Sequence, residues 1–233
     1  MVKLEPSLRE SPQSTATIDR ILAAAEELFA DFGIAGTSVR NITDKAKVNV
    51  AAVNYHFDSK ENLVRKVLER RAADLEQLRT IALDAAEAKA VAEGREPTAI
   101  ELVEAMIFPI VDKALAETDG WQHFIRFLSR LTWEPGFEEL GRPPESQIRI
   151  FERFEAAMMR AVPHLADDLM TRKWRLAFMR SATQQSLMMI TTLKSGKYPK
   201  GLPIAAAAAA TPIETIKREL AAFIASGLAA PKT

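Results

Sequence analysis

The sequence predicts an all-α protein, with a small N-terminal three-helix domain followed by a larger C-terminal helical bundle. Glycine is scarce, with 9 residues among 233, and 48% of the residues are hydrophobic. Alanine, leucine, glutamate and arginine recur at helical spacing along most of the chain, and no segment alternates apolar and polar residues for long enough to indicate a sheet. A chain of this length can bury a substantial core.

Composition excludes several classes of protein. The sequence has no cysteine, so disulfides and thiolate metal sites are excluded and a reducing, cytoplasmic location is expected. The N-terminus lacks the apolar core of a signal peptide, and the longest apolar run, Ile204 to Ala210, is too short to span a bilayer, so no membrane association is expected. Basic and acidic residues both total 31, so only the local distribution of charge can indicate a polyanionic partner.

A polar lead, residues 1–14, precedes the first predicted helix. From about residue 15 the apolar side chains recur on one helical face, at Ile18, Ile21, Leu22, Ala25, Leu28, Phe29 and Phe32. Thr15 or Thr17 can cap the start of this helix, and Gly33 can end it.

Two short helices are predicted next. Thr37 is a suitable N-cap for the first, whose inward residues are Val39, Ile42 and Ala46. Asn49 can cap the second, which runs to about residue 57 and turns toward the core Val50, Val53 and Phe57.

Longer helices are predicted for the rest of the chain. Asp58 and Glu61 have the spacing of a capping box, which starts a run that is either one helix of about thirty residues or two. Thr98 caps a further segment, in which Pro109 is expected to kink or divide the helix. The remaining helices are expected within the ranges 121–135, 144–162, 166–194 and 213–227.

Two short helices joined by "AKVN" and packed on a longer first helix form the pattern of a helix-turn-helix, whose second helix enters the DNA major groove. The stretch "ILAAAEELFADFGIAGTSVRNITDKAKVNVAAVNYHFDSKENLV" resembles, without a gap, the DNA-binding region of the TetR family of bacterial transcriptional regulators. Its part "VNVAAVNYHFDSKENL" most resembles the PsrA-like, fatty-acid-responsive branch. The resemblance implies a DNA-binding domain over residues 15–58, then a connector helix and an effector-binding, dimer-forming domain over residues 59–233.

Local charge agrees with a double-stranded DNA partner. Between residues 34 and 66 six basic residues stand against three acidic ones, and helix starts at Thr37, Asn49 and Ser59 can offer amide groups to phosphates. The residues expected near DNA are Thr37, Ser38, Arg40, Asn49, Ala51, Ala52, Asn54, Tyr55, His56 and Lys60.

Different roles are expected within this set. Asn54 is the favoured base reader, because its amide can pair with adenine, and the small residues Ala51 and Ala52 permit close approach to a thymine methyl. Arg40 is a possible reader of guanine. Tyr55 and Lys60 match phosphate-binding positions of the family, and His56 can add a third phosphate contact. The alternatives are that Tyr55 and His56 cover the small core and that Lys60 is a solvated surface lysine.

Aromatic and methionine side chains are dense in the C-terminal two thirds, where most must form the core. Such side chains between helices also suit an elongated apolar ligand. The candidate effector-pocket residues are Phe108, Trp121, Phe124, Phe127, Arg130, Phe154, Met158, Trp174, Phe178 and Gln184. A fatty acid or acyl-CoA is the effector that the resemblance favours, and a lipophilic drug or aromatic compound is the alternative.

One predicted helix carries three basic side chains among aromatics, His123, Arg126 and Arg130. Like charges this close on a helix disfavour each other unless acids or an anionic ligand lie between them. The segment is therefore either an anion site or a set of ion pairs with carboxylates such as Glu152 or Glu155.

The last two long helices have wide apolar faces, which predicts a homodimer formed through them and, by its two-fold symmetry, a palindromic operator.

No nucleophile elbow, phosphate-cradling loop or paired-histidine zinc motif is found, so neither an enzyme nor a cofactor or metal is expected. His164 beside Asp167 and Asp168 is explained more simply by a helix cap than by an acid-base cluster. The favoured function is a ligand-responsive repressor, and a helical protein-interaction module without DNA binding is the alternative.

Overall fold

The computed structural model describes residues 12–116, 120–131, 145–194, 206–207 and 210–231. Every regular element within these ranges is helical, which confirms the predicted fold class. The α-helices are α1 (Pro12–Phe32), α2 (Val39–Ala46), α3 (Val50–Phe57), α4 (Lys60–Ala92), α5 (Ala99–Leu115), α6 (Trp121–Leu131), α7 (Glu145–Ala161), α8 (Leu169–Lys194) and α10 (Ile213–Ala229). A 3₁₀ turn, η2 (Pro163–Leu165), precedes α8.

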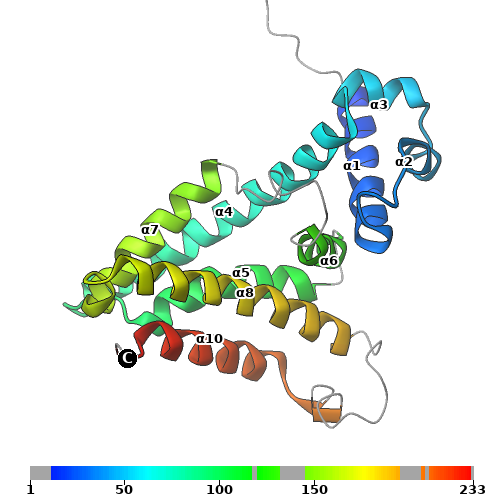
Figure 1. Ribbon diagram of the computed structural model, residues 1–233. Helices are drawn as coiled ribbons and strands as arrows, with labels where there is room; N and C mark the ends of the chain where they lie inside the picture. Colours follow the sequence, from blue (N-terminus) through cyan, green and yellow to red (C-terminus); the bar gives the residue numbers. More distant parts are fainter. Residues whose placement is uncertain (1–11, 117–119, 132–144, 195–205, 208–209, 232–233) are drawn as a thin grey trace, which may run out of the picture.

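The helices form two groups that share α4 (Figure 1). Helices α1, α2 and α3 lie together at one end of the molecule, and α4 runs from them along the larger group that contains α5, α7, α8 and α10. Helix α6 belongs to the second group but packs against α1, with the rings of Phe29 and Phe127 5.5 Å apart. The buried apolar side chains of both groups form one continuous core.

The first helix begins earlier than the sequence predicted. It starts at Pro12, so residues 12–14 of the expected polar lead are helical, and residues 1–11 lie outside the described part. Gly33 ends the helix as expected: its φ is 75°, and its N–H donates to the carbonyl of Phe29. Phe32, predicted to face the core, is 64% exposed, because it is the last residue of the helix and points past the end of the buried face.

Two helix N-caps lie one residue after the positions that the sequence predicted. Ser38, not Thr37, caps α2, because the Thr37 hydroxyl donates instead to the carbonyls of Gly33 and Leu28. Ser59, not Asp58, caps α4 and accepts from the N–H of Asn62. The expected capping box of Asp58 is therefore wrong.

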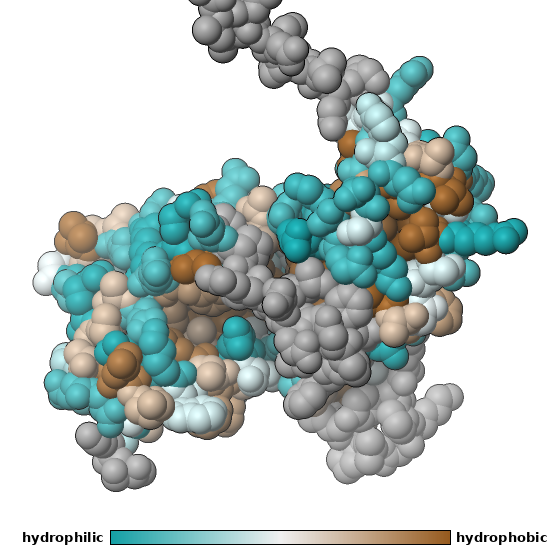
Figure 2. Space-filling model, turned by 45° about the horizontal axis from the view of Figure 1, so that its top comes forward, coloured by the Kyte–Doolittle hydropathy of each residue, from teal (hydrophilic) through white to brown (hydrophobic). Residues whose placement is uncertain are grey.

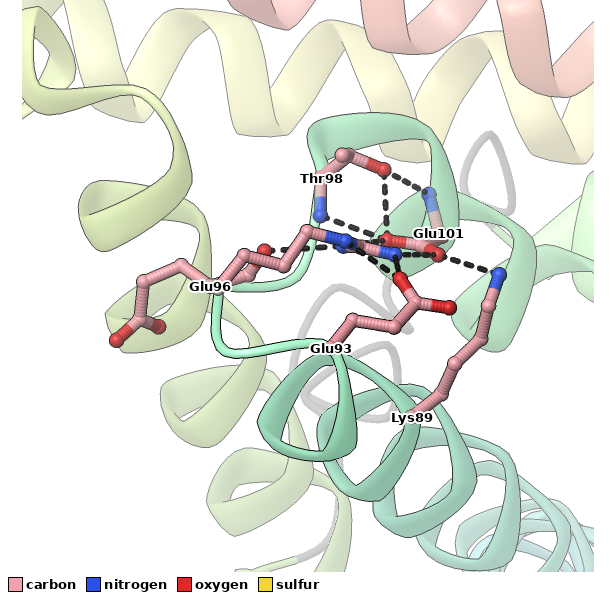
Figure 3. Close-up of polar contacts among 6 residues, drawn as sticks. Lys89, Glu93, Glu96, Thr98 and Glu101 are labelled. Carbon is pink, nitrogen blue, oxygen red and sulfur yellow. Dashed lines mark hydrogen bonds and ion pairs between the residues drawn. The ribbon is translucent and has the colours of Figure 1, made fainter.

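The connector is one helix of 33 residues, which settles the choice between one helix and two. Thr98 caps α5 as predicted, in a capping box with Glu101, and α5 continues through Pro109 without dividing. Figure 3 shows the turn between α4 and α5, where Glu101 accepts hydrogen bonds from Thr98, Lys89 and Arg95. Residues 132–144 and 195–205, which include the end of the helix expected over 121–135 and most of the connection expected before residue 213, lie outside the described residues. Among the described helices, none is both long and apolar enough to cross a membrane.

Candidate nucleic-acid interface

Local hydrogen bonds fix the turn between α2 and α3. At the start of α2, Ser38 Oγ accepts from the N–H of Asn41, and Asn41 Oδ1 accepts from the N–H of Ser38. Lys47 ends α2 in the left-handed region, at φ 55°. Asn49 caps α3 as predicted, with its Oδ1 2.8 Å from the N–H nitrogen of Ala52. These caps hold the two short helices at a defined angle, although eight residues are too few for an independently stable helix.

The buried face of α3 differs by one position from the prediction. Val53 and Phe57 are buried in the core as expected, at 2% and 5% exposure. Val50, predicted to be a third anchor, is exposed, and the half-buried Ala52 packs against the core instead. Val50 is the first residue of α3, and at 47% exposure its side chain belongs to the outward face.

The outward face of α3 carries several of the predicted DNA-contacting residues. Asn49, Ala51, Asn54 and Tyr55 are all exposed. Tyr55 is 85% exposed, which rules out the alternative that its ring covers the small core. The half-buried His56 ring lies against Tyr55 and Phe57, at centroid distances of 5.0 and 6.3 Å, so a covering role suits His56.

Two predicted contact residues are bonded to each other. Lys60, half-buried at the start of α4, donates from Nζ to the carbonyl oxygen of Thr37 at 2.9 Å. Thr37 is 2% exposed, and its hydroxyl and N–H both donate within the protein. In this conformation the Thr37 side chain is therefore not available to DNA, which corrects its place among the contact residues. The bond to Lys60 ties the beginning of α4 to the residue before the α2 cap.

The basic side chains of the interface differ in how far they are neutralised. Lys45, on α2, pairs with Glu27 at 2.7 Å. Arg40 and Lys47 are exposed and have no ion-pair partner among the described residues. Lys47 was not among the predicted contact residues, although its position between two helix ends in the "AKVN" turn was visible in the sequence. Figure 2 shows hydrophilic side chains over much of this end of the molecule, at the upper right.

A buried ion pair joins this end of the molecule to α4 and α6. Glu26 of α1 accepts from Nε and Nη2 of Arg71 at 2.8 and 2.6 Å, and both residues are almost fully buried. The Arg71 guanidinium lies over the Trp121 ring, 4.9 Å from its centroid. Three helices therefore meet at one charged contact.

Two family models match the chain over consecutive parts of this structure. Residues 21–67 match the model described as bacterial regulatory proteins of the tetR family, a range that includes α2 and α3. Residues 104–227, more than half of the 233, match the model described as the tetracyclin repressor-like C-terminal domain. The chain belongs to the TetR family. This membership confirms the resemblance to the TetR family seen in the sequence and places the chain among regulatory proteins rather than enzymes.

Curated relatives named as HTH-type transcriptional repressors match over part of the chain. The Mycobacterium tuberculosis HTH-type transcriptional repressor Rv3405c is 45% identical over 58 residues, which are 25% of this chain and 31% of that protein. The Rhodococcus jostii HTH-type transcriptional repressor KstR2 is 34% identical over 86 residues, which are 36% of this chain and 42% of that protein. The chain thus spans less than half the length of these relatives.

Two solved structures of transcriptional regulators resemble most of the chain. The ketosteroid transcriptional regulator KstR2 of Mycobacterium tuberculosis has a TM-score of 0.54 at 17% identity, covering 97% of this chain and 98% of that one. A transcriptional regulator from Aquifex aeolicus has a TM-score of 0.53 at 21% identity, covering 89% and 97%. At these identities the likeness establishes the fold alone.

The candidate effector residues of this TetR-family chain do not line one common pocket in the described structure. Trp121, Phe124 and Phe127 are buried where α6 packs in the core, and Phe154 and Met158 are buried on α7. They form ordinary close packing, as in the edge-to-face contact of Trp121 with Phe124 at 5.5 Å.

Two of the candidates lie outside the core. Trp174 and Phe178 are 57% and 62% exposed, with their rings stacked 5.6 Å apart on the outer face of α8, so they do not line an interior pocket. Gln184, on the same helix, donates to the carbonyl of Leu128 and links α8 to α6. Phe108 lines an open groove of about 730 Å³ between α4 and α5.

The basic cluster of α6 is held by an acid, but not by the acids predicted. Arg126 pairs with Asp31 at 2.8 Å and also contacts the ring of His123, while Arg130 donates to the Asp31 carbonyl oxygen. Glu155 pairs with Arg172 instead. The ion-pair alternative is therefore the one the structure supports, and the pairs join α6 to the C-terminal end of α1. Asp168 caps α8 through the N–H groups of Met170 and Thr171, as expected for that segment.

Proposed function

We propose that the chain is a dimeric transcriptional repressor that binds a palindromic operator and is released from it by an apolar effector. Residues 15–58 act as the DNA-binding domain, and residues 59–233 act as the connector with the effector-binding and dimerisation domain. The outward face of α3 carries the proposal, because Tyr55 is 85% exposed next to Asn54 while Val53 and Phe57 hold the helix to the core. The word repressor in the names of relatives such as KstR2 supports this function.

Contacts to DNA are divided by chemistry. Asn54 is the proposed base reader, with Ala51 beside it small enough for close approach. Tyr55 and Lys60 are proposed to bind phosphates, since they place a phenol near the end of α3 and an ammonium at the start of α4, and Arg40 of α2 is the proposed reader of guanine. To bind a phosphate, the Lys60 ammonium breaks its hydrogen bond to the Thr37 carbonyl and forms one to the phosphate instead. A small rotation of the flexible lysine side chain is enough for this change.

The dimer is proposed to form through α8 and α10, which lie side by side in Figure 1. Their outer faces expose a group of large apolar side chains, Leu169, Met170, Trp174, Phe178 and Phe223. Exposed large apolar side chains gathered on one helix pair favour an interaction site, and a second copy of the same pair would cover them by two-fold symmetry. Two reading helices are then presented to successive turns of the major groove.

The proposed effector is a fatty acid or an acyl-CoA, and the second candidate is a lipophilic drug or aromatic compound. The apolar cores between α4, α5 and α7 suit either class. For a useful switch the effector must bind the DNA-incompetent state more tightly, with a coupling of about 1 to 3 kcal/mol.

Operator binding tests the proposal. The full chain is titrated by fluorescence anisotropy onto labelled fragments of its own promoter, with and without oleate or oleoyl-CoA, at several salt concentrations. Equal affinities with and without these compounds would remove them as effectors. Failure to bind any fragment would favour a helical protein-interaction module instead.

Two substitutions test the assigned roles. Asn54→Ala should relax preference at one base pair by about 1 to 3 kcal/mol. Lys60→Ala should weaken binding to all sequences and reduce the slope of log affinity against log salt by about 1. Arg149→Ala, at an exposed position on α7, is the control and should change neither.

A further inference from the structure

Two arginines are buried on the same face of α4. The positions Val67, Arg71, Leu75, Arg79 and Leu83 follow one another at four-residue spacing, and all five are buried. Arg71 meets the carboxylate of Glu26 with two hydrogen bonds. Arg79, only 7% exposed, has no carboxylate partner among the described residues.

The surroundings of Arg79 are apolar and come from three helices. Its Nε donates to the carbonyl oxygen of Met106 on α5 at 2.9 Å, and its guanidinium lies over the Phe151 ring of α7, 5.3 Å from the centroid. Pro109 lies three residues after Met106 and cannot donate an N–H to the α5 backbone, so Arg79 donates close to a break in that hydrogen-bond ladder. This structural task uses one of the five N–H donors of the guanidinium.

The other donors of Arg79 have no hydrogen-bond partner in the part of the chain that the structure describes. Its Nη1 and Nη2 make no hydrogen bond to any described residue. They are not among the fully enclosed unpartnered atoms of the described residues, which are Arg126 Nε and Ser129 Oγ, so they retain some solvent-accessible surface although Arg79 as a whole is only 7% exposed. Burial lowers the pKa of Arg79 to about 10, which leaves the side chain cationic at neutral pH. A buried cation without a counter-ion costs free energy that a bound anion would offset.

We propose that Arg79 binds the carboxylate of an amphipathic monoanionic effector where α4, α5 and α7 meet, with the apolar part of the effector packed along the adjoining core. The inference rests on the proposed effector-controlled function and names the group that recognises the effector. The two terminal nitrogens of a guanidinium match the two oxygens of a carboxylate. The anion candidates suggested by the sequence, Arg126 and Arg130, are already held by Asp31. Arg79, by contrast, has no carboxylate partner among the residues that the structure describes.

The charge of the ligand follows from the charge of the site. One carboxylate neutralises one guanidinium and leaves no net charge among Met106, Phe151 and the core. A phosphate dianion or the phosphates of coenzyme A would bring surplus negative charge into that apolar region, at a desolvation cost. A neutral drug or alcohol would leave Arg79 without a counter-ion. Free acids are therefore favoured over both.

Matched ligands on the full-length chain test the assignment by isothermal titration. Oleic acid, oleyl alcohol and oleoyl-CoA share one chain and differ in head group. Wild type should bind the acid about 10- to 100-fold more tightly than the alcohol, the range for hydrogen bonds to a charged group. Arg79→Gln should abolish this preference while binding the alcohol as before. Arg149→Gln, on exposed α7 surface, should keep it.

Several results would overturn the assignment. The first is that wild type binds oleic acid and oleyl alcohol equally. The second is that Arg79→Gln keeps the full preference for the acid. The third is that oleoyl-CoA binds as tightly as oleic acid to both wild type and Arg79→Gln. If Arg79→Gln does not fold, Arg79→Lys is used instead. Lysine keeps the positive charge but loses the two parallel N–H donors of the guanidinium, so the preference for the acid should fall only in part. An unchanged preference would refute the proposal. Operator binding is measured separately. A wild-type chain that binds acid through Arg79 but no promoter fragment would refute the regulatory function alone.

Discussion

Replacing Arg71 with methionine leaves the buried carboxylate of Glu26 without its main partner. The two residues are 5% and 2% exposed and share two hydrogen bonds. Removing one member of a buried pair costs about 3 to 5 kcal/mol, because the other charge stays buried and unpaired. Arg70 lies 3.7 Å from the same carboxylate and favours the lower part of this range. At about 2 to 4 °C per kcal/mol for a chain of this size, the melting temperature should fall by about 6 to 20 °C.

Circular dichroism during heating of the full chain measures this change. Lys66→Met is the matched control, because it breaks the Lys66–Glu69 pair of the same helix, whose side chains are 60% and 40% exposed. Exposed pairs contribute less than about 1 kcal/mol, so the control should lose no more than a few degrees. The double variant Glu26→Gln with Arg71→Met removes both charges and should recover part of the loss. An Arg71→Met protein that melts with the control would refute the reasoning.

Three further predictions follow from other contacts. Trp174→Glu places a charge on the exposed apolar face of α8 and should convert the proposed dimer to a monomer in light scattering; a dimer of unchanged affinity would exclude this face. Ser38→Ala removes the α2 cap and should lower the free energy of unfolding in urea by about 1 kcal/mol, and no change would show the cap to be dispensable. Hydrogen bonds from Arg95 and Lys89 hold the pKa of Glu101 well below its ordinary 4.5, so the ionised carboxyl stabilises the fold above that pH and less below it. Glu101→Gln should therefore lower the melting temperature at pH 7 and approach wild type at pH 3, whereas a constant difference would contradict the pKa.

Sequence spacing predicted which helices exist better than it predicted their ends. Val53 and Phe57 were placed correctly, because apolar residues four apart must share the buried face. Val50 was not, because the first residue of a short helix can project beyond the neighbours that would cover it. Thr37 was expected to be a cap, yet its hydroxyl found carbonyls at the end of α1, and the adjacent Ser38 took the role. Both errors arise from local geometry that residue type alone does not specify.

Contacts between residues distant in sequence were the second thing that the sequence could not predict. The basic cluster of α6 was correctly expected to need an acid, but Asp31 lies 95 residues from Arg126 and is brought there only by the packing of α6 on α1. The sequence did not single out Arg79 as a site residue, because α4 is rich in arginine and most arginines are solvated. Its position between Leu75 and Leu83 was the signal available in the sequence, because that spacing directs an arginine into the core.

The placement of both buried arginines on α4 makes the two proposals jointly testable. Arg79 and Arg71 are eight residues apart, about 12 Å along the helix, and Arg71 is bonded to α1 of the proposed DNA-binding domain. If an acid bound at Arg79 weakens operator binding by some factor, thermodynamic reciprocity requires the operator to weaken acid binding by the same factor, typically about 5 to 150. Arg79→Gln should reduce both factors by the same amount. Unequal factors in wild type would mean that the acid and the operator do not act on a single linked equilibrium, whatever their separate affinities.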